Sequence, residues 1–323
     1  MLNELREDAD LAAVVKTSQR NYRVLVGQGI LSKLPQEMRL AGIKRRAFIV
    51  ADHALFPKVA RAVQDTLETE GFPAHLLAIP SGESIKSLDT ARHIYEWLGS
   101  QRAERGDAIV AIGGGVTGDI VGFAAATWLR GVPIVQVPTT LAAMVDASLG
   151  GKVAVNLPAG KNLVGAFHQP WLVLSDIDLL DTLPQRELAA GWAEAIKHGL
   201  ILDSELLNTI ERNVESLLNL DRPLTVRVIR QSVAIKADVV SADEFETGDT
   251  RVLLNYGHTI GHAIEAVTGF GKFLHGEAVS VGMMGAARIA AMLGMIDPEL
   301  VERQRALLES FGLPLCAPGL PAN

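Results

Sequence analysis

Short apolar runs alternate with amphipathic stretches along the first half of the chain. Strand-like runs, rich in Val, Ile, Leu and Ala, occupy residues 22–26, 47–51, 74–79, 107–112, 133–137 and 171–174. Between them, apolar residues recur at helical spacing over 57–70, 87–105 and 117–129. Strands that alternate with helices predict βαβ units and a mainly parallel sheet.

The second half of the chain has a different pattern. From about residue 185 the periodicity is helical, and we expect helices over 185–202, 204–219, 223–240, from near Asn255, and over 276–293 and 298–311. The boundary falls between residues 170 and 184. We therefore predict a Rossmann-like α/β domain over residues 1–175 and an all-α domain over residues 176–323.

Composition narrows the class of protein. A length of 323 residues suits two domains, and 48% hydrophobic with 21% charged residues is typical of a folded protein. The net charge of −7 argues against a nucleic-acid binder. Cys316 stands alone, which excludes an internal disulfide or a cysteine-based zinc cluster. The start lacks the apolar segment of a signal peptide, and the apolar stretches 108–126 and 278–296 contain charged residues, so we expect a cytoplasmic protein.

A glycine-rich turn follows the strand-like run at 107–112. Residues 113–118 read GGGVTG, which matches G-x-G-x-x-G between a strand and a helix. Such a turn lets a pyrophosphate approach the backbone and the helix N-terminus. It is not the first βα turn, and no acidic residue ends the next strand, although Asp52 after an earlier strand is a candidate for holding a ribose. A merely tight turn is the alternative.

Two further segments combine glycine with charged residues. The segment PSGESIK places Glu83 and Lys86 near a helix start, where a simple helix cap is the alternative explanation. Two Gly-Lys pairs place Lys152 and Lys161 within ten residues, and each lysine can supply a charge to phosphate or carboxylate. A pair of surface turns is the alternative for the second segment.

Histidines and carboxylates gather in the helical half. His258 and His262 are four residues apart and share one helix face, with Glu265 a turn further along. His275 lies near the start of the next helix, and Glu194 lies in an otherwise apolar helix. A mixed His/Glu set without cysteine suits a catalytic zinc, but the spacing leaves open which residues are ligands. Together with the glycine turn, these groups indicate redox chemistry on a phosphorylated, hydroxylated small molecule.

Several long motifs in a fixed order extend this interpretation. They read GGGVTGDIVGFAAATWLRG, GGKVAVNLPAGKN, GWAEAIKHG, LNYGHTIGHAIE and LHGEAVSVGM. The chain resembles the 3-dehydroquinate synthase family over residues 22–314. The resemblance implies a fold like that of glycerol dehydrogenases, with the site in the cleft between the two domains. It also implies bound NAD, a zinc ion that Co²⁺ can replace, and a homodimer.

The resemblance further implies a carbon–oxygen lyase that acts on phosphates. Its substrate would be 3-deoxy-D-arabino-heptulosonate 7-phosphate, and its products 3-dehydroquinate and phosphate, on the route to aromatic amino acids. The implied steps are transient oxidation by NAD, β-elimination of phosphate, reduction, ring opening and aldol closure. The alternatives are an aminodehydroquinate synthase or another sugar-phosphate cyclase, and then an NAD-dependent polyol dehydrogenase.

Matching motif to motif assigns roles to individual residues. The implied metal ligands are Glu194, His258 and His275. The implied substrate and catalytic residues are Arg130, Asp146, Lys152, Asn162, Lys197, Lys236, Glu246, Arg251, Asn255 and His262. The implied cofactor contacts are Asp52, Glu83, Lys86, Gly114, Gly115, Val116, Asp119, Thr139, Thr140, Lys161 and Thr182. Members of the family usually extend some tens of residues further, so we expect the chain to be incomplete after Asn323.

Overall fold

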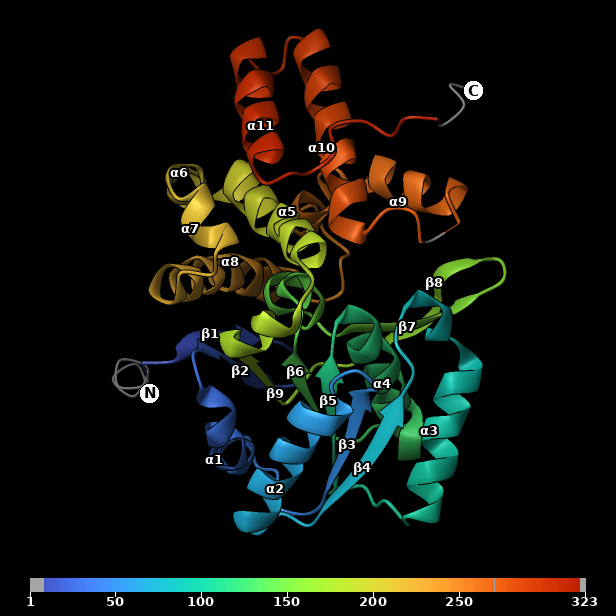
Figure 1. Ribbon diagram of the computed structural model, residues 1–323. Coiled ribbons are helices and arrows are strands. Elements are labelled where there is room, and N and C mark those ends of the chain that lie inside the picture. The colour runs from blue at the N-terminus through green and yellow to red at the C-terminus, as the bar shows by residue number, and fades with distance from the viewer. Residues whose placement is uncertain (1–8, 270, 320–323) are drawn as a thin grey trace.

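A seven-stranded sheet forms the lower half of the molecule, and helices form the upper half (Figure 1). The computed structural model describes residues 9–269 and 271–319. The strand order is β1-β2-β9-β6-β5-β3-β4. The strands are β1 (Leu11–Lys16), β2 (Asn21–Gly27), β3 (Ala47–Asp52), β4 (Ala74–Ile79), β5 (Ala108–Gly113), β6 (Ile134–Pro138) and β9 (Leu172–Asp176).

The sheet is parallel except at one edge. β2, β9, β6, β5, β3 and β4 pair in parallel, whereas β1 pairs with β2 antiparallel. All six predicted strands are confirmed, and the expected mainly parallel sheet with them. The prediction missed β1, whose sequence LAAVVK is only partly buried. An edge strand of this kind has little alternation to mark it in sequence.

Both faces of the sheet are covered because its strands are apolar on both sides. In β3, Phe48 and Val50 belong to one buried cluster and Ile49 to another. α3 (Leu88–Ser100) and α4 (Gly115–Thr127) cover the first face, and α1 (Leu34–Leu40) and α2 (Arg61–Thr69) contribute to the second. This arrangement is expected for parallel strands, whose near-continuous apolar runs need burial on both sides.

A separate two-stranded hairpin projects beside the sheet. β7 (Lys152–Leu157) and β8 (Gly160–Phe167) pair antiparallel, and β7 packs against α4. Figure 1 shows the hairpin extending to the right of β4 and α4. The two Gly-Lys pairs are also compatible with surface turns, and the hairpin that contains both lysines was not predicted. It carries Lys152, Lys161 and Asn162.

Helices make up the second half, as predicted. Among the described residues, no strand follows β9. The helices are α5 (Gln185–Leu202), α6 (Ser204–Arg212), α7 (Val214–Leu218), α8 (Arg222–Ala242), α9 (His258–Val267), α10 (His275–Met292) and α11 (Pro298–Ser310). α5 has the predicted bounds because Pro184 precedes its first residue and Asp203 begins the next helix.

Some helix ends differ from the expected ones. α3 ends at Ser100 rather than at 105, since Arg102 has a left-handed backbone with φ of 52°. The expected helix over 204–219 is broken into α6 and α7 at Asn213, whose backbone is not helical. None of the helices in the described residues is long and apolar enough to cross a membrane. The predicted absence of a signal peptide concerns residues 1–8, which lie outside the described residues.

Candidate active site

Predicted cofactor residues lie at the carboxyl ends of four parallel strands. Asp52 ends β3, the 3₁₀ turn η4 (Glu83–Ile85) follows β4, Gly114 follows β5, and Thr139 follows β6. Because these strands are parallel neighbours, their carboxyl ends meet at one edge of the sheet. This is the edge at which α/β proteins bind nucleotides.

The β5–α4 turn has the properties of a phosphate site. Gly114 is the N-cap of α4, and no side chain caps the helix, so its first N–H groups stay available. A Cβ on Gly114 would lie 3.0 Å from Cγ2 of Thr140, and one on Gly115 would lie 3.2 Å from Ala147. Glycine therefore keeps the space above the helix end open. The donors and the dipole at this end suit the pyrophosphate of a dinucleotide.

The side chain of Lys86 links the turn after β4 to α4 and to the hairpin. Lys86 is buried, its ammonium pairs with the carboxylate of Asp119, and it donates to Oδ1 of Asn162 at 2.5 Å. Burial raises the pKa of Asp119, and the neighbouring Lys86 charge opposes the rise. The ammonium is thus held in place by two elements that are far apart in sequence.

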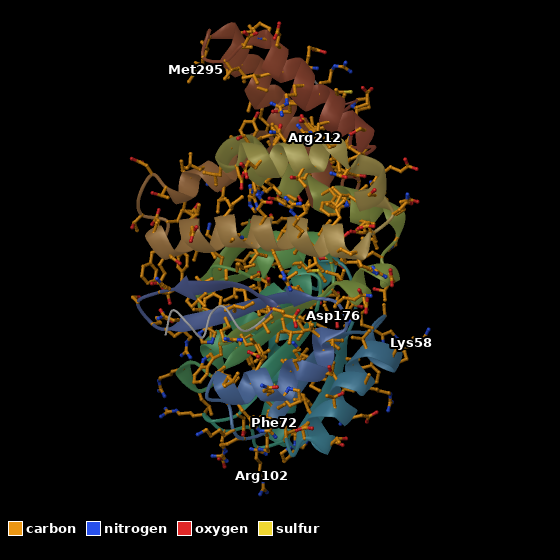
Figure 2. The ribbon with its side chains drawn as sticks, turned by 90° about the vertical axis from the view of Figure 1, so that its left-hand side faces the viewer. Lys58, Phe72, Arg102, Asp176, Arg212 and Met295 are labelled. Carbon is orange, nitrogen blue, oxygen red and sulfur yellow. The ribbon has the colours of Figure 1, made fainter. Side chains whose placement is uncertain are left out.

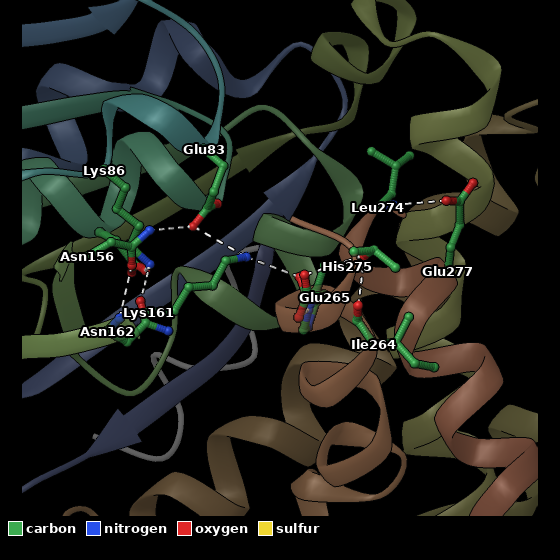
Figure 3. Close-up of polar contacts among 12 residues, drawn as sticks. Glu83, Lys86, Asn156, Lys161, Asn162, Ile264, Glu265, Leu274, His275 and Glu277 are labelled. Atoms are coloured by element: carbon green, nitrogen blue, oxygen red, sulfur yellow. Dashed lines mark hydrogen bonds and ion pairs between the residues drawn. The ribbon is translucent and has the colours of Figure 1, made fainter. Parts of the chain in front are cut away.

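Glu83 and Lys161 form a second link. Asn156 of β7 donates to Oε1 of Glu83 at 2.8 Å, and the Lys161 ammonium lies 3.4 Å from the same oxygen. Lys161 also donates to Oε1 of Glu265 on α9 at 3.2 Å. Figure 3 shows these contacts running from the sheet edge through the hairpin to the helical half.

Three predicted metal ligands converge in the helical half. Glu194 of α5 is fully buried, and its Oε1 lies 3.6 Å from Nε2 of His258 and 3.5 Å from Nε2 of His275. The His258 and His275 rings are 5.2 Å apart. One ligand atom from each residue lies within 4.8 Å of the others. The three side chains come from α5, α9 and the first position of α10.

Hydrogen bonds orient both imidazoles for ligation. Nδ1 of His258 faces the carbonyl oxygen of Tyr256 at 3.3 Å, and Nδ1 of His275 faces Oε2 of Glu265 at 3.4 Å. In each ring the Nδ1–H can donate, which leaves the Nε2 lone pair directed toward Glu194. Donation from Nδ1 therefore leaves Nε2 as the nitrogen that would bind a metal in both rings.

The titration behaviour of the two histidines differs. Burial lowers the pKa of His258 to about 4. Burial also lowers the pKa of His275, but its contacts with the carboxylates of Glu194 and Glu265 outweigh that effect and raise the pKa to about 10. For Glu194, burial raises the pKa, but the charges of Lys197 and the histidines bring it well below the usual range. The result is a buried carboxylate that stays charged.

These residues fit a zinc ion. Three donors around a tetrahedral zinc at about 2.1 Å are roughly 3.4 Å apart, close to the separations of 3.5 and 3.6 Å. Oε2 of Glu194 is paired with the Lys197 ammonium at 2.5 Å, whereas Oε1 faces Nε2 of both histidines and has no hydrogen-bond partner of good geometry among the described residues. A buried carboxylate oxygen in that position favours a metal cation between it and the two imidazoles.

Three buried cations lie near Glu194 and the neighbouring Asp146. Lys197, Lys236 and Arg251 are each at most 5% exposed. Lys236 donates to Oδ1 of Asp146 at 2.5 Å, and Arg251 donates to backbone carbonyl oxygens, one of them Gly150 at 3.2 Å. Asp146 and Glu194 supply two negative charges against these three positive ones. The excess positive charge favours an anionic ligand.

A more exposed cluster of polar side chains lies near Lys152, the first residue of β7. The Lys152 ammonium pairs with the carboxylate of Glu246, and Asn255 donates to Oε1 of Glu246 at 3.1 Å. Glu246 has a left-handed backbone, with φ of 55°. His262 is also exposed, and its ring lies 5.3 Å from that of His258. These are polar groups that a substrate can reach from solvent.

Of two further predicted residues, Arg130 lies away from this cluster, and Thr182 follows β9 at the same edge of the sheet without a side-chain contact to the cluster. Arg130 follows the C-terminal end of α4, whereas the glycine turn lies at its N-terminal end, about 20 Å away for a 13-residue helix. Arg130 is exposed and has a left-handed backbone, with φ of 69°. Thr182 is exposed in the 3₁₀ helix η7 (Ile177–Thr182), where its hydroxyl donates to Leu179. Val116, by contrast, lies in the first turn of α4, beside Gly115.

Sequence reasoning missed two residues of the cluster. Asn156 was not singled out, and Glu265 was noted as one turn beyond His262 without a role. The signal for Glu265 was its spacing, since positions 258, 262 and 265 lie on one helix face. Its partner Lys161 is 104 residues away in sequence, which no local pattern predicts.

Comparison with family models gives two adjoining matches. Residues 76–190 match the N-terminal and residues 191–322 the C-terminal model of 3-dehydroquinate synthase. The chain is 46% identical to the 3-dehydroquinate synthase of Geobacter metallireducens over 96% of this chain and 86% of that one. It is 47% identical to that of Microcystis aeruginosa, over 96% and 85%.

Two of the solved structures with a similar fold contain NAD⁺ and a divalent metal ion. A 2-deoxy-scyllo-inosose synthase with carbaglucose-6-phosphate, NAD⁺ and Co²⁺ is 31% identical, has a TM-score of 0.87 and covers 96% of this chain and 83% of its own. A 2-epi-5-epi-valiolone synthase from Streptomyces hygroscopicus with NAD⁺ and Zn²⁺ is 28% identical, with a TM-score of 0.87 and coverages of 96% and 85%. A probable glycerol dehydrogenase from Sinorhizobium meliloti, 17% identical with a TM-score of 0.64 over 90% and 81%, shares the fold.

Proposed function

Because the chain belongs to the 3-dehydroquinate synthase family, we propose that the residues assembled between the sheet edge and the helices carry out that family's reaction. The reaction converts 3-deoxy-D-arabino-heptulosonate 7-phosphate to 3-dehydroquinate and phosphate. The observation that carries the proposal is the Glu194–His258–His275 set, whose carboxylate is fully buried, with three buried cations nearby. A metal set of this kind beside an excess of positive charge suits a hydroxylated substrate with two anionic groups.

The enzyme uses NAD and a divalent metal ion. Glu194, His258 and His275 would hold the metal, and the β5–α4 turn with Lys86, Asp119 and the neighbouring predicted contacts would hold NAD. Bound there, the two groups would supply transient hydride abstraction and polarisation of the substrate oxygens. Glu194 is fully buried and His258 and His275 are half-buried, so the set is closed on the Glu194 side and open on the histidine side.

The cationic residues would bind and orient the anionic ends of the substrate. Lys197 and Lys236 are fixed by Glu194 and Asp146, so they keep one geometry while the substrate changes. Lys152 and Asn255, which now meet at Glu246, are placed to contact polar groups of the substrate from the open side. His262 is proposed to contact the phosphate, and Arg251, Asn162 and Glu246 other polar groups.

A direct assay tests the proposal. Purified protein with zinc and NAD is mixed with the heptulosonate 7-phosphate, and release of phosphate and formation of 3-dehydroquinate are followed. We expect equal amounts of both products and no net consumption of NAD. Absence of turnover by the full-length, zinc-loaded protein would refute the proposal.

Related substrates separate the alternatives. Glucose 6-phosphate represents the 2-deoxy-scyllo-inosose synthases, since a solved one holds its carbocyclic analogue. The amino analogue of the heptulosonate phosphate represents an aminodehydroquinate synthase, and glycerol with NAD a polyol dehydrogenase. We expect no turnover of glucose 6-phosphate and no net reduction of NAD by glycerol. The ratio of kcat/KM for the heptulosonate and its amino analogue decides between the two closest activities.

Three further properties are proposed on the resemblance to the family. The protein works in the cytoplasm, it forms a homodimer, and it divides into an NAD-binding domain over residues 1–175 and a metal- and substrate-binding domain over residues 176–323. The end of β9 at Asp176 supports that boundary. Sedimentation velocity tests the dimer, which predicts a species of twice the 34.6 kDa chain mass.

A further inference from the structure

The carboxylate of Glu265 contacts two parts of the site at once. It is 5% exposed, and it lies on α9 one turn after His262. Oε2 faces Nδ1 of His275 at 3.4 Å, and Oε1 accepts from the Lys161 ammonium at 3.2 Å. The two contacts use different oxygens, so both can be made together (Figure 3).

The contact with His275 reaches the metal set. A carboxylate that accepts from Nδ1–H fixes the ring and raises the basicity of Nε2 as a ligand. His258 obtains the same orientation from the backbone oxygen of Tyr256. The hydrogen-bond acceptor for Nδ1 of His275 is instead a side chain, that of Glu265, which also accepts from Lys161.

The contact with Lys161 reaches the cofactor side. Lys161 lies on β8, and its ammonium also lies 3.4 Å from Glu83 in the turn after β4. Glu83 in turn accepts from Asn156 of β7. The chain of contacts from His275 to Glu83 thus passes through Glu265 and Lys161, from the helical half to the nucleotide edge of the sheet.

We propose that Glu265 is a positioning residue that couples metal binding at His275 to NAD binding at the hairpin. The inference rests on the proposed ligand set and cofactor site. A metal held by His275 fixes Glu265, which fixes Lys161 against the turn where NAD binds. By linkage, NAD bound beside Lys161 strengthens metal binding by the same factor.

A different role for Glu265 is direct ligation. His262, Glu265 and His275 also lie close enough to hold an ion. That arrangement would use His275 Nδ1 in place of Nε2 and would leave Oε1 of the buried Glu194 without a metal ion. Oε1 of Glu194 faces Nε2 of both His258 and His275, which favours the set with Glu194, and the spectrum of bound Co²⁺ separates the two.

Three substitutions separate the contact of Glu265 with His275 from its contact with Lys161. Glu265→Ala removes both contacts. Glu265→Gln keeps an oxygen for His275 but no charge for Lys161, and Lys161→Met removes only the contact on the cofactor side. The dissociation constant of zinc is measured by chelator competition with and without saturating NAD, and that of NAD by calorimetry with and without zinc. Glu96→Gln, the same chemical change on the exposed face of α3, is the matched control.

The expected pattern is specific. In the unchanged protein and in Glu96→Gln, zinc tightens NAD by at least about fivefold, and NAD tightens zinc equally. Glu265→Ala weakens zinc alone by about 10–100-fold and brings the coupling factor to within twofold of one. Glu265→Gln and Lys161→Met lose the coupling too, but keep zinc affinity without NAD within about fivefold. A double variant of Glu265→Ala with Lys161→Met shows no further loss of coupling.

Several results would overturn the inference. One is a coupling factor between zinc and NAD that is the same in Glu265→Ala as in the unchanged protein. Another is the absence of coupling in an unchanged protein that binds both zinc and NAD. A Co²⁺ absorption spectrum that shows a lost ligand in Glu265→Ala would assign direct ligation instead. Failure of the unchanged protein to bind zinc or NAD would refute the proposed function itself. Far-UV circular dichroism of each variant without ligands confirms that it is folded.

Discussion

At the scale of single residues, neighbouring histidines on α9 are given different tasks by their contacts. Nε2 of His258 points at buried Glu194, whereas His262 is exposed and has no place in the set of Glu194, His258 and His275. We predict that His258→Ala weakens zinc binding by more than about 100-fold, since loss of a ligand exceeds the 10–100-fold effect of losing a hydrogen-bond partner of a ligand. We predict that His262→Ala keeps the metal and slows turnover, because His262 is proposed to contact the substrate. Chelator competition with elemental analysis measures the first effect. Equal zinc loss in both variants would show that the ligands are assigned wrongly.

A buried neutral histidine should make stability depend on pH. His198 is buried on α5 with Nδ1 2.6 Å from the Ser232 hydroxyl, and burial lowers its pKa to about 3. The unfolded chain binds a proton near pH 6.5 and the folded one does not, so stability is lost as the pH falls below 6.5. Between pH 7 and 5 the unfolding free energy should fall by about 2 kcal/mol more in the unchanged protein than in His198→Asn.

Urea unfolding of the zinc-free proteins at both pH values measures this difference. The asparagine keeps a polar atom near the position of Nδ1 and does not titrate, so other titrating groups cancel in the comparison. The same pH dependence in both proteins would contradict a neutral His198.

The chemistry of the site could be predicted from the sequence at this scale, but its connectivity could not. Residue types and spacing indicated a metal bound by histidine and carboxylate, yet they left the ligands open. Only packing of α5 against α9 and α10 decides that Glu194 meets His258 and His275. The same holds for Lys86, whose partners Asp119 and Asn162 are 33 and 76 residues away.

At the scale of elements, close helix packing holds the histidines together. A Cβ on Gly282 of α10 would come within 1.9 Å of the carbonyl oxygen of Gly257, which precedes α9. A Cβ on Gly285 would meet only the flexible end of Ile260, at 2.6 Å. We predict that Gly282→Ala costs about 2–3 kcal/mol because two backbones must separate. Gly285→Ala should stay within about 1 kcal/mol, since better helix propensity offsets the contact.

Urea unfolding measures both costs, and zinc affinity gives a second readout. Separation of α9 from α10 moves His258 away from His275, so Gly282→Ala should also weaken zinc binding, whereas Gly285→Ala should not. Equal stability of the two variants would mean that the helices have room to adjust.

Elements with a strong local pattern were predicted well, and those without one were not. α5 was predicted with its correct bounds because it is long, periodic and bounded by Pro184 and Asp203. β8 contains glycine and polar residues and has no buried position, whereas β7 buries Val153 and Val155 but is short, and both strands lie outside the main sheet. Their strand conformation depends on pairing with each other and on packing against α4, which are tertiary effects.

At the scale of the whole molecule, the edge of the sheet is tied to helix α8. Figure 2 shows α8 lying above the blue strands β1 and β2 near the middle of the molecule. Arg230 of α8 donates to the carbonyl oxygen of Val26 at 2.6 and 2.8 Å and to Asp10 at 3.1 Å. We predict that Arg230→Met costs about 1–3 kcal/mol, because the Val26 carbonyl and the Asp10 carboxylate lose a charged donor.

Thermal or urea unfolding checks this, with exposed Arg227→Met on the same helix as the control. NAD affinity should stay within twofold in both variants, since the contacts lie away from the β5–α4 turn. A loss of stability in the control as large as in Arg230→Met would point to helix α8 itself rather than to its contacts with the sheet.

The tie between β1 and α8 also sets an order for folding during synthesis. The backbone N–H of Lys16 donates to Ser241 and that of Ser18 to Glu244, across 225 and 226 residues of chain. At 5–20 residues per second, the ribosome needs roughly 10–45 s to make the intervening segment. Until then the first hairpin lacks the helix that packs on it, and its strands are open to pairing with other chains. The nascent chain is therefore most exposed to aggregation before α8 emerges, and chaperones that bind short apolar strands would act on it in that interval.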